Sequence, residues 1–346
     1  MKRNLFIGIL LLLIASCSKE NDPVINYPAG FDPSGSKGLF LLNEGNFNRG
    51  NGSVSFFSYD SLTLFNNVFS VINSRPLGDT PNSINISNDK VFIIVNNSGK
   101  IEILDTTDLV SVATIRNLVS PRNISFVNSS KAYITSLYSD SITIIDTKSL
   151  EIKGFINIKH STESILTISS KSFAANWAGG NKIFIIDNAA DVVIDSIEVG
   201  MEPESIVCDR NKMLWILCNG GWAREKNAEL CCYNTQTGNI ERRLIFQTLD
   251  DSPSCLQVDG SGETLFYLNK GVWRINILDT ELPDEAFIPE SGHLFYRMSV
   301  NPANGEIFVT DAVNYQDKGY LLRYDSDGEL ISEYQADVNP GAMFYK

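Results

Sequence analysis

The sequence predicts an all-β protein, a seven-bladed β-propeller in which each blade is a sheet of four antiparallel strands. Two observations predict it: a strand-like segment that recurs seven times and ends at Asp or Asn, and a regular spacing between those ends. The closing residues are Asp60, Asp105, Asp146, Asp187, Asn234, Asn276 and Asp325. The gaps between them are 45, 41, 41, 47, 42 and 49 residues. A period of roughly 40–50 residues in a strand-rich chain is typical of propeller blades or a related array.

The recurring segment has the pattern of a third strand that ends in a hairpin. In "SITIIDTKSL", which runs from Ser141, a strand-like apolar stretch leads to Asp146 and small polar residues follow it. The short side chain of Asp or Asn accepts hydrogen bonds from backbone N–H groups two residues on, and this closes a turn. We expect a fourth strand after each turn, as in "EIKGFIN" from Glu151 and "VVIDSIEV" from Val192.

A first and a second strand precede this segment in each repeat. The first strand opens on a turn of the Pro-x-Ser-Ile type, and the second is apolar and aromatic, as in "KVFIIVN" and "MLWILCN". The first strands start at Pro81, Pro121, Thr162, Pro203, Pro253, Phe295 and Pro340, the versions at Thr162 and Phe295 being degenerate. "GLFLLNE" from Gly38 supplies the seventh second strand.

The two ends of the chain predict how the ring closes. The repeats begin with a second strand, Gly38–Glu44, and finish with a first strand, Gly341–Tyr345. One blade is therefore built from both termini, which hides the sheet edges that an open ring would expose. A β-sandwich would need about a hundred residues and would show no such period.

The N-terminus is typical of a secretory signal. Lys2 and Arg3 precede an apolar run from Leu5 to Ile14, which is too short to span a bilayer. The tetrapeptide that ends at Cys17 resembles a bacterial lipobox, in which the signal is cut before a Cys that becomes the lipidated N-terminal residue. The alternative is an ordinary signal peptide with a chance Cys.

We therefore divide the chain into a lipoprotein signal peptide at 1–16, a lipidated Cys17 with a flexible tether at 17–37, and a propeller at 38–346. The hydrophilic "SKENDP" after Cys17 looks like the tag that sends some lipoproteins to the outer face of the outer membrane. The tether is punctuated by Pro, Gly and Ser. Some 20 flexible residues span about 25 Å, enough to hold a domain off a membrane.

Composition limits the partners. Removal of Lys2 and Arg3 with the signal leaves 26 basic and 41 acidic residues, a net charge of −15. This disfavours nucleic acid and peripheral binding to anionic lipid, because both need a basic surface. Five cysteines follow Cys17, namely Cys208, Cys218, Cys231, Cys232 and Cys255. A Cys218–Cys231 bridge and buried free thiols are both open alternatives.

Enzyme signatures are missing from the sequence. It has no GxSxG elbow, no HExxH and no phosphate-binding GxxxxGK[ST]. "DSDGEL" at Asp325 lacks the full calcium-loop pattern and falls where the repeat needs a hairpin. We expect no catalytic residue, no bound metal and no cofactor, although Arg122 with a Glu leaves a propeller lyase as a third alternative.

Propellers bind ligands at one end of the central channel, and two sets of loops meet there: those that enter the first strands and those that join the second and third strands. Aromatic residues and Asn are interleaved in these Gly-rich loops, which suggests apolar platforms beside amide hydrogen-bonding groups. About half of the aromatics have the alternative role of capping adjacent loops. The predicted ligand-binding residues are Phe47, Asn82, Asn97, Arg122, Tyr138, Trp177, Glu204, Trp222, Arg224, Tyr296 and Tyr315. Trp177 has the further alternative of packing between blades.

The two histidines share a position in the repeat. His160 and His293 each precede the start of a first strand by two residues. A neutral imidazole is a possible axial ligand of a cobalt ion, and a hydrogen-bonding role at the rim is the alternative that we favour.

The repeats, as in "VGMEPESIVCD" and "LCCYNTQTGNIERRL", resemble those of YVTN-type, YncE-like propellers over nearly all of residues 38–346. The lipobox, the tag and the opening "LFLLNEGNFNRGNGSVSFFSYDS" together resemble BtuG-type surface lipoproteins. That resemblance implies capture of vitamin B12 and related corrinoids for a TonB-dependent outer-membrane transporter, at the surface of the outer membrane. A corrinoid, the transported ligand, is a broad apolar ring with a carboxamide rim. A glycan- or protein-binding module is the alternative function.

Overall fold

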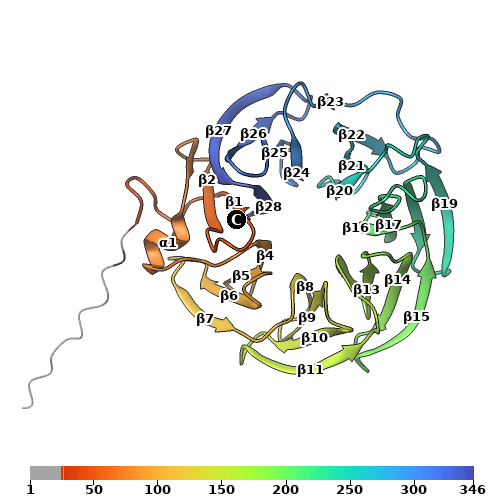
Figure 1. Ribbon diagram of the computed structural model, residues 1–346, viewed down its shortest axis with the longest axis horizontal. Coiled ribbons are helices and arrows are strands. Elements are labelled where there is room, and N and C mark those ends of the chain that lie inside the picture. Colours follow the sequence, from red (N-terminus) through yellow and green to blue (C-terminus); the bar gives the residue numbers. More distant parts are fainter. Residues whose placement is uncertain (1–24, 26) are drawn as a thin grey trace, which may run out of the picture.

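The computed structural model describes residue 25 and residues 27–346. The expected signal peptide and Cys17 lie outside the described residues. Seven four-stranded antiparallel sheets are arranged in a ring, which confirms the predicted seven-bladed propeller (Figure 1). Among the described residues no helix is long and apolar enough to cross a membrane.

Six blades are each formed by consecutive strands, and we number them 1 to 6 along the chain. Blade 1 comprises β4 (Pro81–Ser87), β5 (Lys90–Val95), β6 (Lys100–Asp105) and β7 (Ser111–Ile115). Blade 2 comprises β8 (Pro121–Asn128), β9 (Lys131–Ser136), β10 (Ser141–Asp146) and β11 (Glu151–Asn157). Blade 3 comprises β12 (Ile165–Ile168), β13 (Lys171–Asn176), β14 (Lys182–Asp187) and β15 (Val192–Glu198).

The next three blades follow the same plan. Blade 4 comprises β16 (Pro203–Cys208), β17 (Met213–Cys218), β18 (Glu229–Asn234) and β19 (Asn239–Ile245). Blade 5 comprises β20 (Ser254–Val258), β21 (Thr264–Leu268), β22 (Gly271–Asn276) and β23 (Ile288–Pro289). Blade 6 comprises β24 (Phe295–Val300), β25 (Ile307–Asp311), β26 (Lys318–Tyr324) and β27 (Leu330–Val338).

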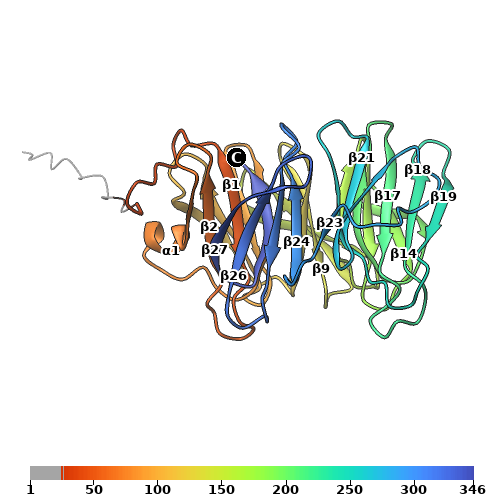
Figure 2. The ribbon, with the colours of Figure 1, turned by 90° about the horizontal axis from the view of Figure 1, so that it is seen from above.

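The closing blade joins the two ends of the chain, as predicted. It comprises β28 (Pro340–Tyr345), β1 (Gly38–Asn43), β2 (Ser53–Ser58) and β3 (Thr63–Phe65), in that order from the channel outward. The C-terminal strand β28 pairs with β1 in the register Leu39–Tyr345 and Phe40–Phe344. Figure 2 shows the two strands side by side in the wall of the ring.

Six of the seven predicted turns form with the expected side-chain hydrogen bonds, whereas at Asp60 the Ser61 N–H donates to Ser58 Oγ instead. Asp146 Oδ1 accepts hydrogen bonds from the N–H groups of Lys148 and Ser149, both at 2.8 Å. Asp325 Oδ1 likewise accepts from Asp327 N–H and Glu329 N–H, so the "DSDGEL" segment is a hairpin. Equivalent hydrogen bonds are made by the side chains of Asp105, Asp187, Asn234 and Asn276.

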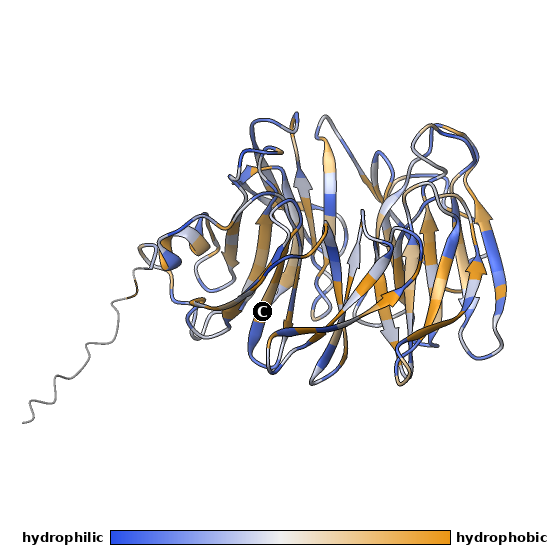
Figure 3. Ribbon diagram, turned by 60° about the horizontal axis from the view of Figure 1, so that its bottom comes forward, coloured by the Kyte–Doolittle hydropathy of each residue, from blue (hydrophilic) through white to orange (hydrophobic). Residues whose placement is uncertain are grey.

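The core lies between blades. The second and third strands are buried almost throughout, because each sheet is covered on both faces by its neighbours. The fourth strands alternate between exposed and partly or fully buried residues, as β11 and β19 do. Figure 3 shows this pattern as hydrophobic strand interiors and hydrophilic loops. The five described cysteines are free thiols, and Cys218 and Cys231 pack in the core between blades 3 and 4.

Two outer strands are unusually short. β3 has three residues, and the helix α1 (Val68–Asn73) and the buried Phe31 cover the core beside it. The Phe31 ring lies 5.4 Å from that of Phe56 and 5.1 Å from that of Phe65. Phe31 falls within the expected tether, so the part of the tether around this residue is attached to the propeller. β23 has only two residues, and no helix within residues 27–346 covers it.

Candidate functional site

One end of the ring carries both sets of loops named by the sequence, and we call it the loop face. The loops from β1 to β2, β9 to β10, β17 to β18 and β25 to β26 each project an aromatic side chain there. The exposed fractions are 69% for Phe47, 79% for Tyr138, 89% for Trp222 and 47% for Tyr315. The four rings thus stand exposed on loops of four different blades, all at the same end of the ring.

The backbone of the β17–β18 loop explains the exposure of Trp222. Gly220 and Gly221 have φ values of 88° and 97°, in the left-handed region that favours glycine. A Cβ on Gly220 would lie 2.4 Å from the carbonyl oxygen of Lys226. These two glycines let the loop turn back tightly, and Trp222 lies just beyond them and outside the packed core.

The mouth of the central channel is lined by residues at the starts of the first strands. A β-bulge interrupts the ladder there, for example between Pro81 and Ser83 and between Pro203 and Ser205. Bulges change the direction of side chains. The cavity in the channel has a volume of about 360 Å³ and is lined by Asn82, Glu163, Glu204 and Arg297 among others.

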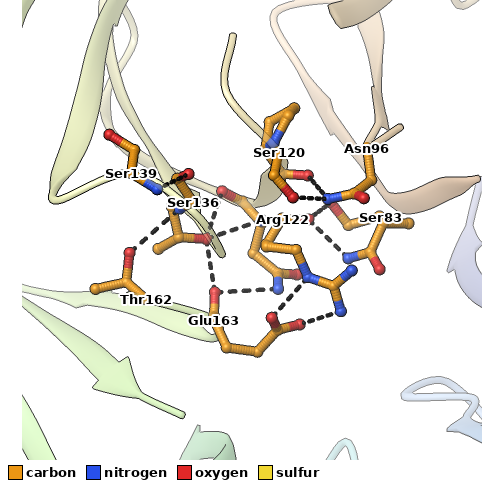
Figure 4. Close-up of polar contacts among 12 residues, drawn as sticks. Ser83, Asn96, Ser120, Arg122, Ser136, Ser139, Thr162 and Glu163 are labelled. Atoms are coloured by element: carbon orange, nitrogen blue, oxygen red, sulfur yellow. Dashed lines mark hydrogen bonds and ion pairs between the residues drawn. The ribbon is translucent and has the colours of Figure 1, made fainter. Parts of the chain in front are cut away.

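Arg122 and Glu163 join two neighbouring blades across this mouth (Figure 4). Arg122 donates from Nε to Glu163 Oε2 at 2.6 Å and from Nη2 to Glu163 Oε1 at 2.9 Å. Burial acts to lower the pKa of Arg122, but Glu163 outweighs that effect and the pKa is raised. Asn82 Nδ2 and Ser83 Oγ both donate to the carbonyl oxygen of Arg122. The ion pair and its polar neighbours therefore form hydrogen bonds with one another.

A second polar group lies on the opposite side of the mouth. Tyr296 Oη donates to Glu44 Oε1 at 2.8 Å, and burial is the main cause of the raised pKa of Tyr296. The Arg297 guanidinium lies 4.5 Å from the centre of the Tyr296 ring. Burial acts to lower the pKa of Arg297, but nearby Tyr296, Glu204 and Glu44 outweigh that effect, and the pKa is raised. Glu204 Oε2 accepts the N–H of Cys255 at 2.9 Å.

The structure places all eleven predicted residues on the loop face, but it brings few of them into contact. Asn82 contacts Arg122, and the rings of Tyr296 and Tyr315 meet edge to face with centroids 5.5 Å apart. Asn97 is exposed and donates to Asn48 and Asp79, and Arg224 is exposed on the same loop as Trp222. The predicted residues thus form an outer set of aromatics and an inner set of polar groups.

Trp177 differs from the other aromatics. It follows β13 directly, is half-buried, and its Nε1 is buried with no hydrogen-bond partner among the described residues. Trp177 therefore lies in the loop after β13, with its indole N–H directed into the protein.

Glu44 and Arg297 are site residues that the sequence interpretation missed. Arg297 follows the predicted Tyr296 directly, and Glu44 directly follows the second strand of the closing blade. Arg122 and Glu163 occupy the same position in neighbouring repeats and carry opposite charges. This is the sequence signal that would have predicted the ion pair between them.

The two histidines have different neighbours. His160 stacks on Phe184 with centroids 5.4 Å apart, and His293 Nδ1 lies 2.8 Å from Asp311 Oδ2. Within residues 27–346, no group of three or more His, Cys, Asp or Glu side chains is arranged to hold a metal ion.

Fold and site together define a seven-bladed propeller with an aromatic loop face around a polar channel mouth. The chain belongs to the family described as Domain of unknown function (DUF5074), whose model matches residues 37–345. No curated protein sequence matches it significantly.

Solved structures share the fold at low sequence identity. A quinonprotein alcohol dehydrogenase-like protein from Bacteroides thetaiotaomicron is 16% identical with a TM-score of 0.72, over 91% of this chain and 79% of that one. A functionally unknown protein from Desulfotomaculum acetoxidans is 15% identical with a TM-score of 0.66, over 90% and 99%. Hydrazine synthase from Kuenenia stuttgartiensis is 12% identical with a TM-score of 0.62, over 76% and 88%. At these identities the likeness shows the fold alone.

Proposed function

We propose that this protein is a cell-surface lipoprotein that binds vitamin B12 and related corrinoids on its loop face. It passes them to a TonB-dependent transporter of the outer membrane. The observation that carries the proposal is the solvent exposure of the rings of Phe47, Tyr138, Trp222 and Tyr315, on loops at the end of the ring where the channel opens.

Exposed aromatic rings suit a ligand with a broad apolar surface. Covering an aromatic side chain removes about 150–250 Å² of surface from water, and the loops that carry these rings lie outside the core. The corrin ring offers such a surface. Its rim of carboxamides both donates and accepts hydrogen bonds, which matches the amides of Asn97 and Asn82 and the carboxylate of Glu204.

The size of the channel favours binding across the mouth. A whole corrinoid is larger than the channel cavity of about 360 Å³, so the ring would lie on the loop face with one edge over the polar mouth. The polar groups at the mouth already hold one another, and this fixes their positions before the ligand arrives. Preorganisation of this kind lowers the cost of binding.

We propose a binding role without catalysis. A general acid or base must be free to exchange a proton with a substrate. Arg122 and Glu163 instead form a bidentate, largely buried pair, with exposed fractions of 14% and 11% for their side chains. The Tyr296 hydroxyl is likewise occupied by Glu44.

The proposed location depends on Cys17. A lipidated Cys17 would hold the propeller at the membrane, since each buried CH₂ of an acyl chain contributes about 0.8 kcal/mol. We predict that Cys17→Ala releases the protein from membranes and leaves the propeller folded. Fractionation of cells that express the variant measures this, and a variant that stays in the membrane fraction would show that the anchor lies elsewhere.

Calorimetry of the propeller with cyanocobalamin and with cobinamide tests the proposed ligand. We expect heat of binding at micromolar protein for both, because both contain the corrin ring. No heat with either corrinoid would refute the proposal.

A glycan-binding module is the second candidate. The exposed rings have asparagines beside them, as Asn314 is beside Tyr315, and sugars stack on aromatic rings while their hydroxyls bond to amides. A panel of surface polysaccharides in the same calorimeter separates the two. Heat with a glycan and none with corrinoids would favour this candidate.

A further inference from the structure

A second cavity lies away from the channel, at the rim between blades 4 and 5. It has a volume of about 530 Å³, within the range of small-molecule sites. It exists because the fourth strand of blade 5 has only two residues, which pair with Gly271 and Val272 alone. Figure 1 shows the long connection from β22 to β23 swinging outward toward β19, and the cavity lies beside that connection.

The floor of the cavity is aromatic. The rings of Tyr267 and Trp273 are stacked, with 6.3 Å between centroids and 7° between planes, and Phe246 meets Tyr267 edge to face at 5.6 Å. Trp273 Nε1 donates to the carbonyl oxygen of Asn269 at 2.7 Å, so the orientation of the indole is fixed. These residues belong to the core between the blades, which opens to the outside at this place.

The outer wall of the cavity is the connection from β22 to β23, and two arginines hold it in position. Arg242 on β19 donates from Nη1 to the carbonyl oxygen of Asp279 at 2.7 Å and from Nη2 to that of Ile277 at 2.5 Å. At the other end of the wall, the Arg274 guanidinium lies 3.7 Å from the centre of the Phe287 ring. The wall between these two anchors carries Leu282, which packs against the same core.

The charged groups that line the cavity are mainly acidic: Asp251, Glu281 and Asp284 against Arg243. The charge of Arg243 is already engaged, because its Nη1 lies 2.5 Å from Glu229 Oε1. Asp251 is held by neutral donors, Asn269 Nδ2 and Thr248 N–H, so these contacts leave its charge without a cation in direct contact. Glu281 and Asp284 are exposed and form no ion pair in the described part of the chain.

Hydrogen bonds keep Asp251 ionised. Partial burial acts to raise the pKa of Asp251, but the hydrogen bonds from Asn269 and Thr248 outweigh it, with a smaller contribution from the nearby Lys270. The pKa is lowered as a result.

We propose that this rim cavity binds a small organic cation with an apolar body, such as an alkyl- or arylammonium ion. The apolar body covers the Trp273 ring, and the ammonium group lies toward the carboxylates of the outer wall. An aromatic floor with acidic groups around it attracts cations both through the ring face and through charge. This inference does not rest on the proposed corrinoid function, although Arg224 of the loop face touches the cavity lining, donating from Nη1 to the carbonyl oxygen of Asp251 at 3.4 Å.

Three indole compounds of matched size test the proposal. Tryptamine is cationic, tryptophol is neutral and indole-3-propionate is anionic at pH 7. Titrated calorimetrically into the full-length protein, tryptamine is expected to bind with a Kd of about 1 mM, as its size allows. Tryptophol is expected to bind about fivefold more weakly, and indole-3-propionate more weakly still.

Variants locate the site. The double variant Glu281→Gln, Asp284→Asn should reduce the preference for tryptamine over tryptophol without changing the melting temperature, because both side chains are exposed. The double variant Asp327→Asn, Glu329→Gln, at an exposed turn of blade 6, is the matched control and should leave the preference unchanged. Equal binding of the three compounds, or no binding of tryptamine at millimolar concentration, would overturn the proposal. So would an equal effect of the two double variants.

Discussion

Trp222→Ala is the substitution that tests the corrinoid face most sharply. Trp222 is 89% exposed in the free protein, so nearly all of its surface is available to a ligand. Covering one face of the indole would remove roughly 100 Å² from water, half of the area of a Trp side chain. At about 25 cal/mol per Å² this corresponds to ~2.5 kcal/mol, and hence to a loss of affinity of about sixtyfold in the variant.

Calorimetric titration with cyanocobalamin measures the loss, and thermal unfolding of the same samples checks the fold. The melting temperature should not change, because Trp222 lies outside the core. Phe155→Ala is the matched control, since Phe155 is 64% exposed but lies on the outer strand β11. An unchanged affinity for Trp222→Ala, or an equal loss in Phe155→Ala, would refute the assignment of the ligand to the loop face.

Three further predictions concern stability. Deletion of 340–346 removes β28 and exposes β1, so we expect insolubility or a large fall in melting temperature; a soluble protein with unchanged melting would contradict the closure of the ring. Phe31→Ala should cost about 3 kcal/mol in urea unfolding, because Phe31 is buried against Phe56 and Phe65; no loss would show that this segment is not needed to cover β3. The buried Glu102 carboxylate is opposed by desolvation, but Arg75, Lys100 and Ser111 outweigh it and lower its pKa to about 2. Glu102 thus contributes about 2–3 kcal/mol to the free energy of unfolding above the unfolded-state pKa near 4.5, and this contribution is lost as the pH falls toward 2. Glu102→Gln should therefore remove this part of the acid sensitivity, and an identical dependence of stability on pH in the variant would contradict the prediction.

The fold was predictable because one blade is a local unit of sequence. Each turn depends on a side chain and the backbone two or three residues on, as at Asp146, and such short-range chemistry can be read from a single chain. The closure by β28 was predictable for a related reason, since the order of strands within the repeat shows which strand each terminus lacks.

Features between blades were harder to predict. The six-residue helix α1 has no side-chain cap, and Phe31 covers the core beside β3, a strand that is shorter than the other repeats indicate. The two-residue β23, and with it the rim cavity, depends on how the chain between β22 and β23 leaves the sheet. No local periodicity encodes that path.

The candidate site likewise has a part that local sequence predicts and a part that depends on contacts between blades. The exposed aromatics could be predicted, because Trp222 and Tyr138 lie in polar loops where packing does not require them. The partners of the inner residues could not be predicted from one repeat. Arg122 bonds with Glu163, which lies 41 positions away in the next blade, and Tyr296 bonds with Glu44 across the closure of the ring.

Hydrogen exchange with and without cyanocobalamin locates the bound ligand without any substitution. If corrinoids bind on the loop face, exchange slows in the loop-face segments 45–52, 137–140, 177–181, 219–228 and 312–317. Exchange stays unchanged in the turns at the opposite end, such as 147–150, 235–238 and 325–328. Protection confined to those turns or to the rim between blades 4 and 5, or no protection at saturating ligand, would show that corrinoids do not bind on the loop face.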